Sequence, residues 1–317
     1  MRFLVTGGAG FIGSNFIRLL VNKYPHDEIT VLDKLTYAGR LENLADIRDR
    51  LRFIHGDICK SNDIAKGGPY DVIFNFAAET HVDRSITDPE SFVKTDVVGT
   101  CTLLNYALKH DVDRYIQIST DEVYGSTPRG SFREEDILDP SSPYSASKAA
   151  AEHLVSSFHK TYGLPVLITR SSNNFGPFQY PEKLIPVLII RAVSNQQLPI
   201  YGNGQNIRDW LYVDDNCMGI DAVYARGKTG EVYNIGAGNE KTNIEIAKTV
   251  LNLLNKSEDL ITFVQDRPGH DFRYSIATEK IRGLEWTPVH TFEEGMKKTI
   301  DWYLANPGWW RPLLQLR

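Results

Sequence analysis

The sequence predicts an α/β protein with a doubly wound parallel sheet and a smaller C-terminal lobe. Short apolar, β-branched runs alternate with longer segments of helical period, and this alternation stops near residue 175. Strand, helix and strand in repetition, joined by right-handed crossovers, give a parallel sheet with helices on both faces, as in a Rossmann domain. The predicted strands are Arg2–Thr6, Glu28–Leu32, Arg52–His55, Val72–Phe76, Tyr115–Ser119 and Val166–Thr169. The predicted helices include Phe11–Asn22, Pro89–Lys109 and Pro143–Thr161.

The chain divides into two expected parts. Residues 1–175 form the predicted Rossmann domain, and residues 176–317, where Pro, Gly and Asn become frequent, form the smaller substrate-binding lobe. The boundary is soft, because late segments can return to the first sheet. Ligands of doubly wound sheets bind at the carboxyl ends of the strands, so the site is expected at those ends.

Composition excludes several classes of protein. The formal net charge of −5 and the pI of about 5.9 argue against a general attraction to nucleic acid or to an anionic membrane. No apolar run approaches the roughly 20 residues of a membrane span. Cys59, Cys101 and Cys217 form no CxxC pair, which argues against a disulfide framework or a zinc site. We therefore expect no metal and a cytoplasmic location.

A glycine-rich turn follows the first predicted strand and opens a helix. In Gly7-Gly8-Ala9-Gly10-Phe11-Ile12-Gly13, the glycines at positions 7, 10 and 13 allow a tight turn and close approach of a pyrophosphate to the backbone. The helix N-terminus supplies free N–H groups and a favourable dipole for the same anion. The turn alone also fits a ligand-free loop, but its place after a first strand favours a dinucleotide.

The ends of the next strands indicate which dinucleotide. Asp33 ends the second strand, where a carboxylate accepts hydrogen bonds from the adenosine ribose and repels a 2′-phosphate, which favours NAD over NADP. Lys34 weakens this preference, because a cation tolerates phosphate. Asp57 follows the third strand and can meet the adenine amino group, and Ala77 and Ala78 leave room for the cofactor after the fourth. The predicted NAD contacts are Gly7, Gly10, Phe11, Ile12, Gly13, Asp33, Lys34, Thr36, Asp57, Ile58, Ala77, Ala78, Thr80, Tyr144 and Lys148.

Tyr144 and Lys148 lie four residues apart near the start of a predicted helix, with Pro143 in its first turn. This spacing places both side chains on one face. We expect the lysine cation to lower the tyrosine pKa, which makes Tyr144 a base able to take a hydroxyl proton. A tyrosine and lysine at this spacing also fit a surface pair, so the interpretation depends on the glycine turn.

Two adjacent carboxylates, Asp121 and Glu122, follow the strand Tyr115–Ser119. In a regular strand they would point to opposite faces, so they share one site only if the strand ends and the backbone turns. In a desolvated cleft their pKa values are driven apart, so that one acts as an acid and the other as a base. A solvated loop entry is the plain alternative.

Together, Gly7/Gly10/Gly13, Asp33, Ser119-Thr120 and Tyr144/Lys148 resemble the extended short-chain dehydrogenases that modify nucleotide sugars. Within that group, Ser119-Thr120-Asp121-Glu122-Val123-Tyr124-Gly125 resembles the signature of the dTDP-glucose 4,6-dehydratases. One residue departs from the family pattern, which usually has Asn where Asp96 stands. Further matching segments are Asp33–Gly39, Ala78–Ser85, Arg170–Asn174, Glu182–Pro186, Arg208–Trp210 and Arg267–Asp271.

The resemblance implies a three-step reaction with NAD. Tyr144 takes the proton of the sugar 4-hydroxyl as C4 is oxidised, while Lys148 stabilises the phenolate and Thr120 orients the hydroxyl. Glu122 then removes the C5 proton and Asp121 protonates the departing 6-hydroxyl. Reduction at C6 gives a 4-keto-6-deoxy sugar nucleotide. The predicted catalytic residues are Thr120, Asp121, Glu122, Tyr144 and Lys148.

A nucleotide-sugar substrate also requires cations for its diphosphate. Arg208 and Arg267 are candidates, because planar guanidinium groups match phosphate oxygens. The resemblance adds Asn174 and Lys183 at the diphosphate-sugar end. The predicted substrate contacts are His81, Ser85, Thr120, Asn173, Asn174, Lys183, Arg208, Arg267 and His270.

Three alternatives stay open at this point. A UDP-sugar 4-epimerase or a UDP-glucose 4,6-dehydratase would share the fold and NAD, although an epimerase needs neither Asp121 nor Glu122. A non-catalytic NAD-binding regulator would keep the glycine turn without the catalytic residues.

The predicted helices Pro89–Lys109 and Pro143–Thr161 carry apolar residues beyond one stripe. The resemblance implies that they pair across a homodimer as a four-helix bundle.

Overall fold

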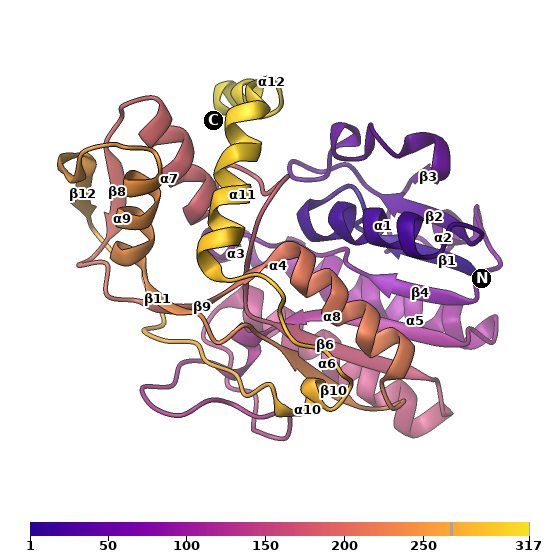
Figure 1. The fold of residues 1–317 in the computed structure, drawn as a ribbon. Coiled ribbons are helices and arrows are strands. Elements are labelled where there is room, and N and C mark those ends of the chain that lie inside the picture. The colour runs from indigo at the N-terminus through magenta and orange to yellow at the C-terminus, as the bar shows by residue number, and fades with distance from the viewer. Residues whose placement is uncertain (267–268, 317) are drawn as a thin grey trace.

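The computed structural model describes residues 1–266 and 269–316, and its largest element is a seven-stranded sheet in the order β10-β6-β5-β4-β1-β2-β3 (Figure 1). Every neighbouring pair in this sheet is parallel. Its strands are β1 (Arg2–Thr6), β2 (Glu28–Asp33), β3 (Arg52–His55), β4 (Val72–Asn75), β5 (Arg114–Thr120), β6 (Val166–Ser171) and β10 (Val232–Ile235). The α/β fold with a doubly wound parallel sheet is therefore confirmed.

Helices cover both faces of this sheet, because alternate residues of each strand point to opposite sides. Phe3 and Val5 of β1 pack in one core, with residues of α1 (Phe11–Lys23) and α8 (Val213–Arg226). Leu4 of the same strand packs in the other core, with residues of α5 (Thr100–Lys109) and α6 (Pro143–Tyr162).

The second lobe has its own small sheets and its own core. One sheet has the order β11-β9-β7 and another pairs β12 with β8. In Figure 1 the part with α7, α9, β8 and β12 lies to one side of the large sheet. Its strands are β7 (Asn173–Phe175), β8 (Leu198–Tyr201), β9 (Ile207–Tyr212), β11 (Glu240–Thr242) and β12 (Ile261–Val264). Its core lies among α7 (Leu184–Val193), α9 (Asn243–Leu253), α11 (Phe292–Ala305) and α12 (Pro307–Trp310).

Late segments return to the large sheet, as the soft boundary at residue 175 allowed. Strand β10 pairs with β6, and α8 packs against α1, although both lie within the expected lobe 176–317. The main sheet thus draws on both halves of the sequence. The assignment of substrate binding to the lobe as a whole stays a prediction.

The six predicted strands agree with β1 to β6 within two residues at each end. The predicted continuous helix Pro89–Lys109 is wrong in its middle. It divides into α4 (Pro89–Phe92), a π-helical segment η3 (Val93–Gly99) and α5. The wider turn of a π-helix turns Asp96 inward, where its side chain is 2% exposed. The remaining helices are α2 (Ser61–Ala65), α3 (Val82–Thr87) and α10 (Glu279–Arg282).

Candidate active site

A cleft of about 280 Å³ runs along the carboxyl edge of the large sheet and collects most of the predicted site residues. Its walls come from the glycine turn, the ends of β2 to β6, the start of α6 and the segment 173–183. The predicted residues that line it are Gly7, Gly10, Phe11, Ile12, Gly13, Asp33, Lys34, Thr36, Asp57, Ile58, Ala77, Ala78, Thr80, Thr120, Asp121, Glu122, Tyr144, Lys148, Asn173, Asn174 and Lys183.

The glycine turn has the shape that a close backbone ligand requires. Gly7 adopts φ +65°, and a Cβ there would lie 2.6 Å from the Ala77 nitrogen. A Cβ on Gly13 would lie 2.5 Å from the Gly7 oxygen. Helix α1 begins after Gly10 with no side-chain cap and no acidic residue in its first turn. Residues 10–13 line the cleft, so the N-terminal end of α1 and the positive end of its dipole lie where pyrophosphate binding needs them.

Asp33 holds the turn in place and keeps acceptor capacity for a ligand. One carboxylate oxygen accepts the Ala9 N–H at 2.9 Å, and the other accepts the Leu35 N–H at 2.8 Å. Each oxygen has a second lone pair, so the carboxylate can still accept from ribose hydroxyls. This geometry is compatible with the predicted contact to adenosine.

Lys34 and Asp57 have a relationship that their separate places in the sequence do not reveal. They form an ion pair at 2.9 Å across the ends of β2 and β3. Burial opposes ionisation of Asp57, but the Cys59 N–H and the Lys34 cation outweigh it and lower the Asp57 pKa. Lys34 is thus neutralised by its neighbour, which weakens its expected tolerance of a 2′-phosphate.

Helix α6 presents Tyr144 and Lys148 together, because its start is well defined. Ser142 caps the helix in a capping box with Ser145, and Pro143 occupies the first turn. Tyr144 and Lys148 then lie one turn apart and both line the cleft. The Lys148 ammonium donates to the Ile118 carbonyl oxygen at 2.7 Å, which fixes it beside the end of β5.

The expected lowering of the Tyr144 pKa by Lys148 is wrong for the protein's own groups. Burial, followed by the carboxylates of Glu122 and Asp96, raises the pKa of Tyr144 well above its usual value. A hydrogen bond with Thr120 acts in the opposite direction. Burial also lowers the pKa of the Lys148 ammonium, and Asp96 and Glu152 oppose this. The chain alone therefore holds Tyr144 as a neutral phenol.

The two adjacent acids lie in a turn, as a shared site requires. Strand β5 ends at Thr120, and Asp121–Tyr124 form a single 3₁₀ turn, η4, so that both carboxylates line the cleft. Asp121 is 3% exposed. Burial, then Glu122 and Asp209, raise the pKa of Asp121 well above its usual value. The expected perturbation is confirmed in direction for Asp121, whose raised pKa shifts its equilibrium towards the protonated form.

Arg208 lies outside the lining of the cleft but acts on it. It is 6% exposed and donates to the backbone oxygens of Ile207 and Asp271, while its guanidinium stacks 4.2 Å from the Tyr274 ring centre. Its charge opposes the rise in the Asp121 pKa. Arg208 is therefore a buried cation on the lobe side of the two acids.

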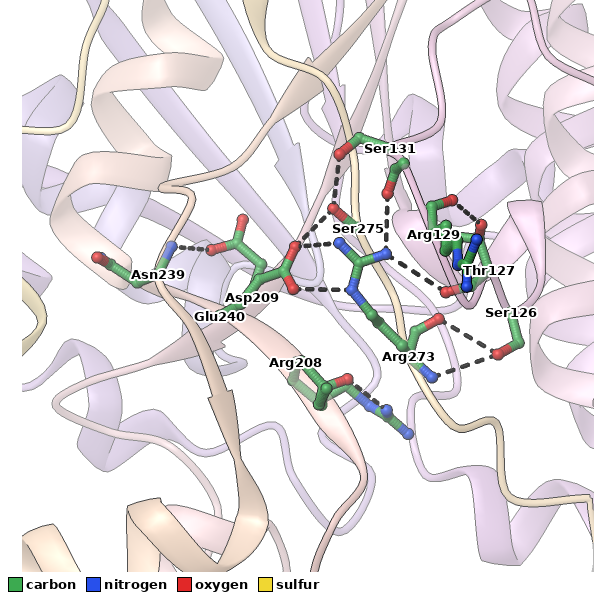
Figure 2. A network of polar contacts seen from close by, with 12 residues as sticks. Ser126, Thr127, Arg129, Ser131, Arg208, Asp209, Asn239, Glu240, Arg273 and Ser275 are labelled. Carbon is green, nitrogen blue, oxygen red and sulfur yellow. Dashed lines mark hydrogen bonds and ion pairs between the residues drawn. The ribbon is translucent and has the colours of Figure 1, made fainter.

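A polar network beside Arg208 ties the loop after η4 to the lobe (Figure 2). The Arg273 guanidinium pairs with Glu240 of β11 at 2.6 Å and donates to the Gly130 oxygen at 2.8 Å. Ser275 donates to Glu240 and contacts Ser131, each at 2.8 Å. These contacts fix the chain that follows the acid-bearing turn.

The structure does not bring every predicted substrate contact into the cleft. The buried Ser85 hydroxyl donates to the Val82 oxygen at 2.6 Å. His81 lies 4.0 Å from Glu182, and His270 lies 2.6 Å from Asp266 in the second lobe. Neither histidine lines the cleft. Arg267 lies outside the described residues, so its predicted contact is not placed.

Tyr37 and Glu182 line the cleft but are not among the contacts that the sequence predicts. Tyr37 donates to Glu182 at 2.8 Å, and the Arg84 guanidinium lies 3.6 Å from the Tyr37 ring centre. Two predicted contacts also meet in the cleft lining, where Lys183 donates to the Thr80 oxygen at 2.7 Å. These contacts join three segments distant in sequence over the mouth of the cleft. The only available signal was their presence in the matching segments 33–39, 78–85 and 182–186.

Buried polar atoms along the cleft point to a polar ligand. The Ser119 hydroxyl and the side-chain oxygens of Asn173, Asn174 and Gln179 are buried without a hydrogen-bond partner within residues 1–266 and 269–316. Within the same residues, one carboxylate oxygen of Asp121 is also buried without a hydrogen-bond partner. Because buried polar groups are nearly always paired, such a cluster fits a ligand rich in hydroxyl groups.

The same described residues contain neither a metal site nor a membrane-spanning helix. No group of three or more His, Cys, Asp or Glu side chains in them could hold a metal ion. None of the described helices is long and apolar enough to cross a membrane.

Comparison with known proteins places this geometry in a family. The family model described as GDP-mannose 4,6-dehydratase matches residues 4–299. A dTDP-glucose 4,6-dehydratase from Streptomyces niveus is 50% identical, covering 99% of this chain and 96% of the relative. The low-salt glycan biosynthesis protein Agl12 of Haloferax volcanii is 52% identical, covering 96% of this chain and 99% of the relative.

A solved structure agrees closely as well. The crystal structure of DesIV, a dTDP-glucose 4,6-dehydratase from Streptomyces venezuelae with NAD bound, matches with a TM-score of 0.96 and 49% identity over 99% of this chain and 100% of that one. The chain therefore belongs to the GDP-mannose 4,6-dehydratase family and, within it, to the dTDP-glucose 4,6-dehydratases.

Proposed function

We propose that this chain is an NAD-dependent dTDP-glucose 4,6-dehydratase, a hydro-lyase that forms dTDP-4-keto-6-deoxyglucose. The observation that carries the proposal is the turn at Asp121–Tyr124, which directs two carboxylates into the same cleft as Tyr144, Lys148 and the glycine turn. Full-length relatives at about 50% identity support it. An oxidation at C4 alone would need Tyr144 and Lys148, and the two acids add the means to eliminate water.

The residues at the glycine turn fit NAD. Glycine at positions 7 and 13 lets the turn pack tightly against neighbouring backbone, and the uncapped start of α1 at the cleft suits a pyrophosphate. Asp33 would accept hydrogen bonds from the adenosine ribose. The ion pair of Lys34 with Asp57 would lie beside the adenine. NAD supplies the acceptor for the C4 hydride and later its source for C6, together with a positive charge on the nicotinamide ring.

The chain's own groups prepare the first step. Tyr144 accepts the proton of the sugar 4-hydroxyl at its phenolic oxygen, with Thr120 as its hydrogen-bonding neighbour. The protein holds Tyr144 neutral, so the phenolate needs a cation to form. Lys148, held by the Ile118 oxygen, does not bring the Tyr144 pKa below its usual value, so the phenolate that accepts this proton would need the positive charge of a bound nicotinamide as well.

The two acids carry out the elimination. The 4-ketone acidifies the C5 proton, which the Glu122 carboxylate removes. Asp121, whose raised pKa favours its protonated form, gives its proton to the departing 6-hydroxyl. Glu122 then returns a proton to C5. Asn173, Asn174 and Lys183 line the same cleft and are assigned to the sugar and diphosphate.

Product analysis tests this function directly. Purified protein would be incubated separately with dTDP-glucose, UDP-glucose and UDP-galactose, and the sugars followed by NMR. The proposal predicts a 4-keto-6-deoxy product, formed most efficiently from dTDP-glucose. A preference for UDP-glucose with the same product would correct the nucleotide, and interconversion of the UDP-hexoses would identify an epimerase.

We also propose a cytoplasmic homodimer. The segment Val82–Lys109 and helix α6 expose apolar side chains that a second copy would cover, namely Ile86, Val93, Val98 and Tyr162. The three free cysteines suit a reducing compartment. In sedimentation, the protein should show twice the 35.9 kDa chain mass, and Val98→Glu should reduce it to one chain. A wild-type monomer would contradict the dimer.

A further inference from the structure

Asp96 is a buried acid close to the pair Tyr144 and Lys148, and the proposed reaction gives this acid no role. It lies in the π-helical segment η3 and is 2% exposed. One carboxylate oxygen accepts the Glu79 N–H at 3.0 Å, and the other accepts the Ser147 hydroxyl at 2.6 Å. Asp96 therefore joins the segment after β4 to helix α6, one residue before Lys148.

The charge of Asp96 acts on both members of the pair. Burial lowers the pKa of Lys148, and the charge of Asp96 counteracts this more strongly than that of Glu152. Glu152 is in turn paired with Arg170 at 2.6 Å, which leaves Asp96 as the acid that acts most strongly on Lys148. The same carboxylate also raises the pKa of Tyr144.

We propose that Asp96 is a positioning residue for Tyr144 and Lys148: its buried carboxylate anchors helix α6 to the segment after β4, and its negative charge sets the pH range in which the pair works. An anion favours the lysine ammonium and disfavours the tyrosine phenolate. Both groups therefore titrate at higher pH than they would beside a neutral residue. The effect of Asp96 on the reaction rests on the proposed function, whereas its effect on Lys148 does not.

The surroundings allow Asp96 to carry this charge near neutral pH. Burial raises the pKa of Asp96 to about 6, and Lys148 and the Ser147 hydroxyl limit the rise. The other acid that acts on it is Glu79. On its outer side, η3 contacts Cys59, whose thiol donates to the Lys94 oxygen at 3.2 Å, while Glu90 of α4 is exposed. The carboxylate is thus ionised at pH 8.

Asparagine at position 96 removes the negative charge but can keep both hydrogen bonds of the side chain. Its oxygen can still accept the Glu79 N–H, and its amide can donate to the Ser147 oxygen. The Ser147 hydroxyl already lies 2.8 Å from the Tyr144 carbonyl oxygen and can donate there. Asp96→Asn is therefore expected to fold. Ser147→Ala makes the opposite change, because it removes one hydrogen bond and keeps the charge.

The test measures the pH dependence of dTDP-glucose dehydration and, separately, the titration of Lys148 by ¹³C NMR of lysine labelled at Cε, assigned with Lys148→Arg. In Asp96→Asn, both limbs of the activity profile and the Lys148 titration should move to lower pH by about one unit or more. Ser147→Ala should leave the alkaline limb in place. Asp49→Asn, the same change at an exposed residue, should match wild type.

A lower rate in Asp96→Asn at every pH with unmoved limbs and an unmoved Lys148 titration would overturn the inference. An absence of dTDP-glucose turnover in wild type would instead refute the proposed function. The NMR titration would then still decide whether Asp96 tunes Lys148.

Discussion

Glu122 is the residue to which we assign removal of the C5 proton. Glu122→Gln keeps the shape of the side chain and its place in η4 but removes the base. Overall dehydration should fall by about 10²–10⁴-fold, the usual contribution of a positioned acid or base. Oxidation at C4, which depends on Tyr144 and Lys148, should persist as NADH absorbance in a single turnover. Normal turnover by this variant would contradict the assignment.

Asp121 should make stability depend on pH. Its pKa is raised in the folded protein, so the folded state holds the proton more tightly than the unfolded chain. Wild type should therefore lose stability as the pH rises from the unfolded-state pKa towards the raised folded-state pKa, by about 1.4 kcal/mol for each pH unit between them. Asp121→Asn should lack this slope and lose dehydration activity. Parallel melting temperatures for the two proteins across pH 5–9 would show that Asp121 titrates normally.

At the scale of elements, a buried ion pair joins the catalytic helix to the acid-bearing turn. Glu152 of α6 pairs with Arg170 of β6 at 2.6 Å, and Arg170 also donates to the Tyr124 hydroxyl of η4 at 2.6 Å. Glu152→Gln would leave the Arg170 charge buried and unpaired, at a cost of about 3–5 kcal/mol. Denaturant unfolding should show this loss, whereas Glu90→Gln at an exposed site should not. Equal losses in the two variants would refute the role of the pair.

Local sequence signals predict some of these elements and not others. The strands and the start of α6 were predictable, because apolar runs, Pro143 and Ser142 act locally. The π-helical segment was not predicted, and its inward Asp96 contacts Ser147, 51 residues away in sequence, which no local pattern reveals. The Lys34–Asp57 pair and the raised Tyr144 pKa likewise depend on neighbours that only the folded chain brings together.

At the scale of the whole molecule, one cleft gathers residues from position 7 to position 183 along one edge of a parallel sheet. The fold predicts this meeting, because the carboxyl ends of parallel strands share an edge. The second lobe was less predictable. Arg208 lies buried near Asp121 rather than in the lining of the cleft, and β10 returns from the lobe to the main sheet.

The central claim is that the two acids and Tyr144 act in sequence on one sugar. Its most direct test is the conversion of dTDP-glucose in D₂O, followed by NMR and by absorbance of NADH. We expect a 4-keto-6-deoxy product that carries deuterium at C5, with no net accumulation of NADH. A product without deuterium at C5, or one formed with stoichiometric NADH, would contradict the assignment of Glu122 and the return of the C4 hydride to C6.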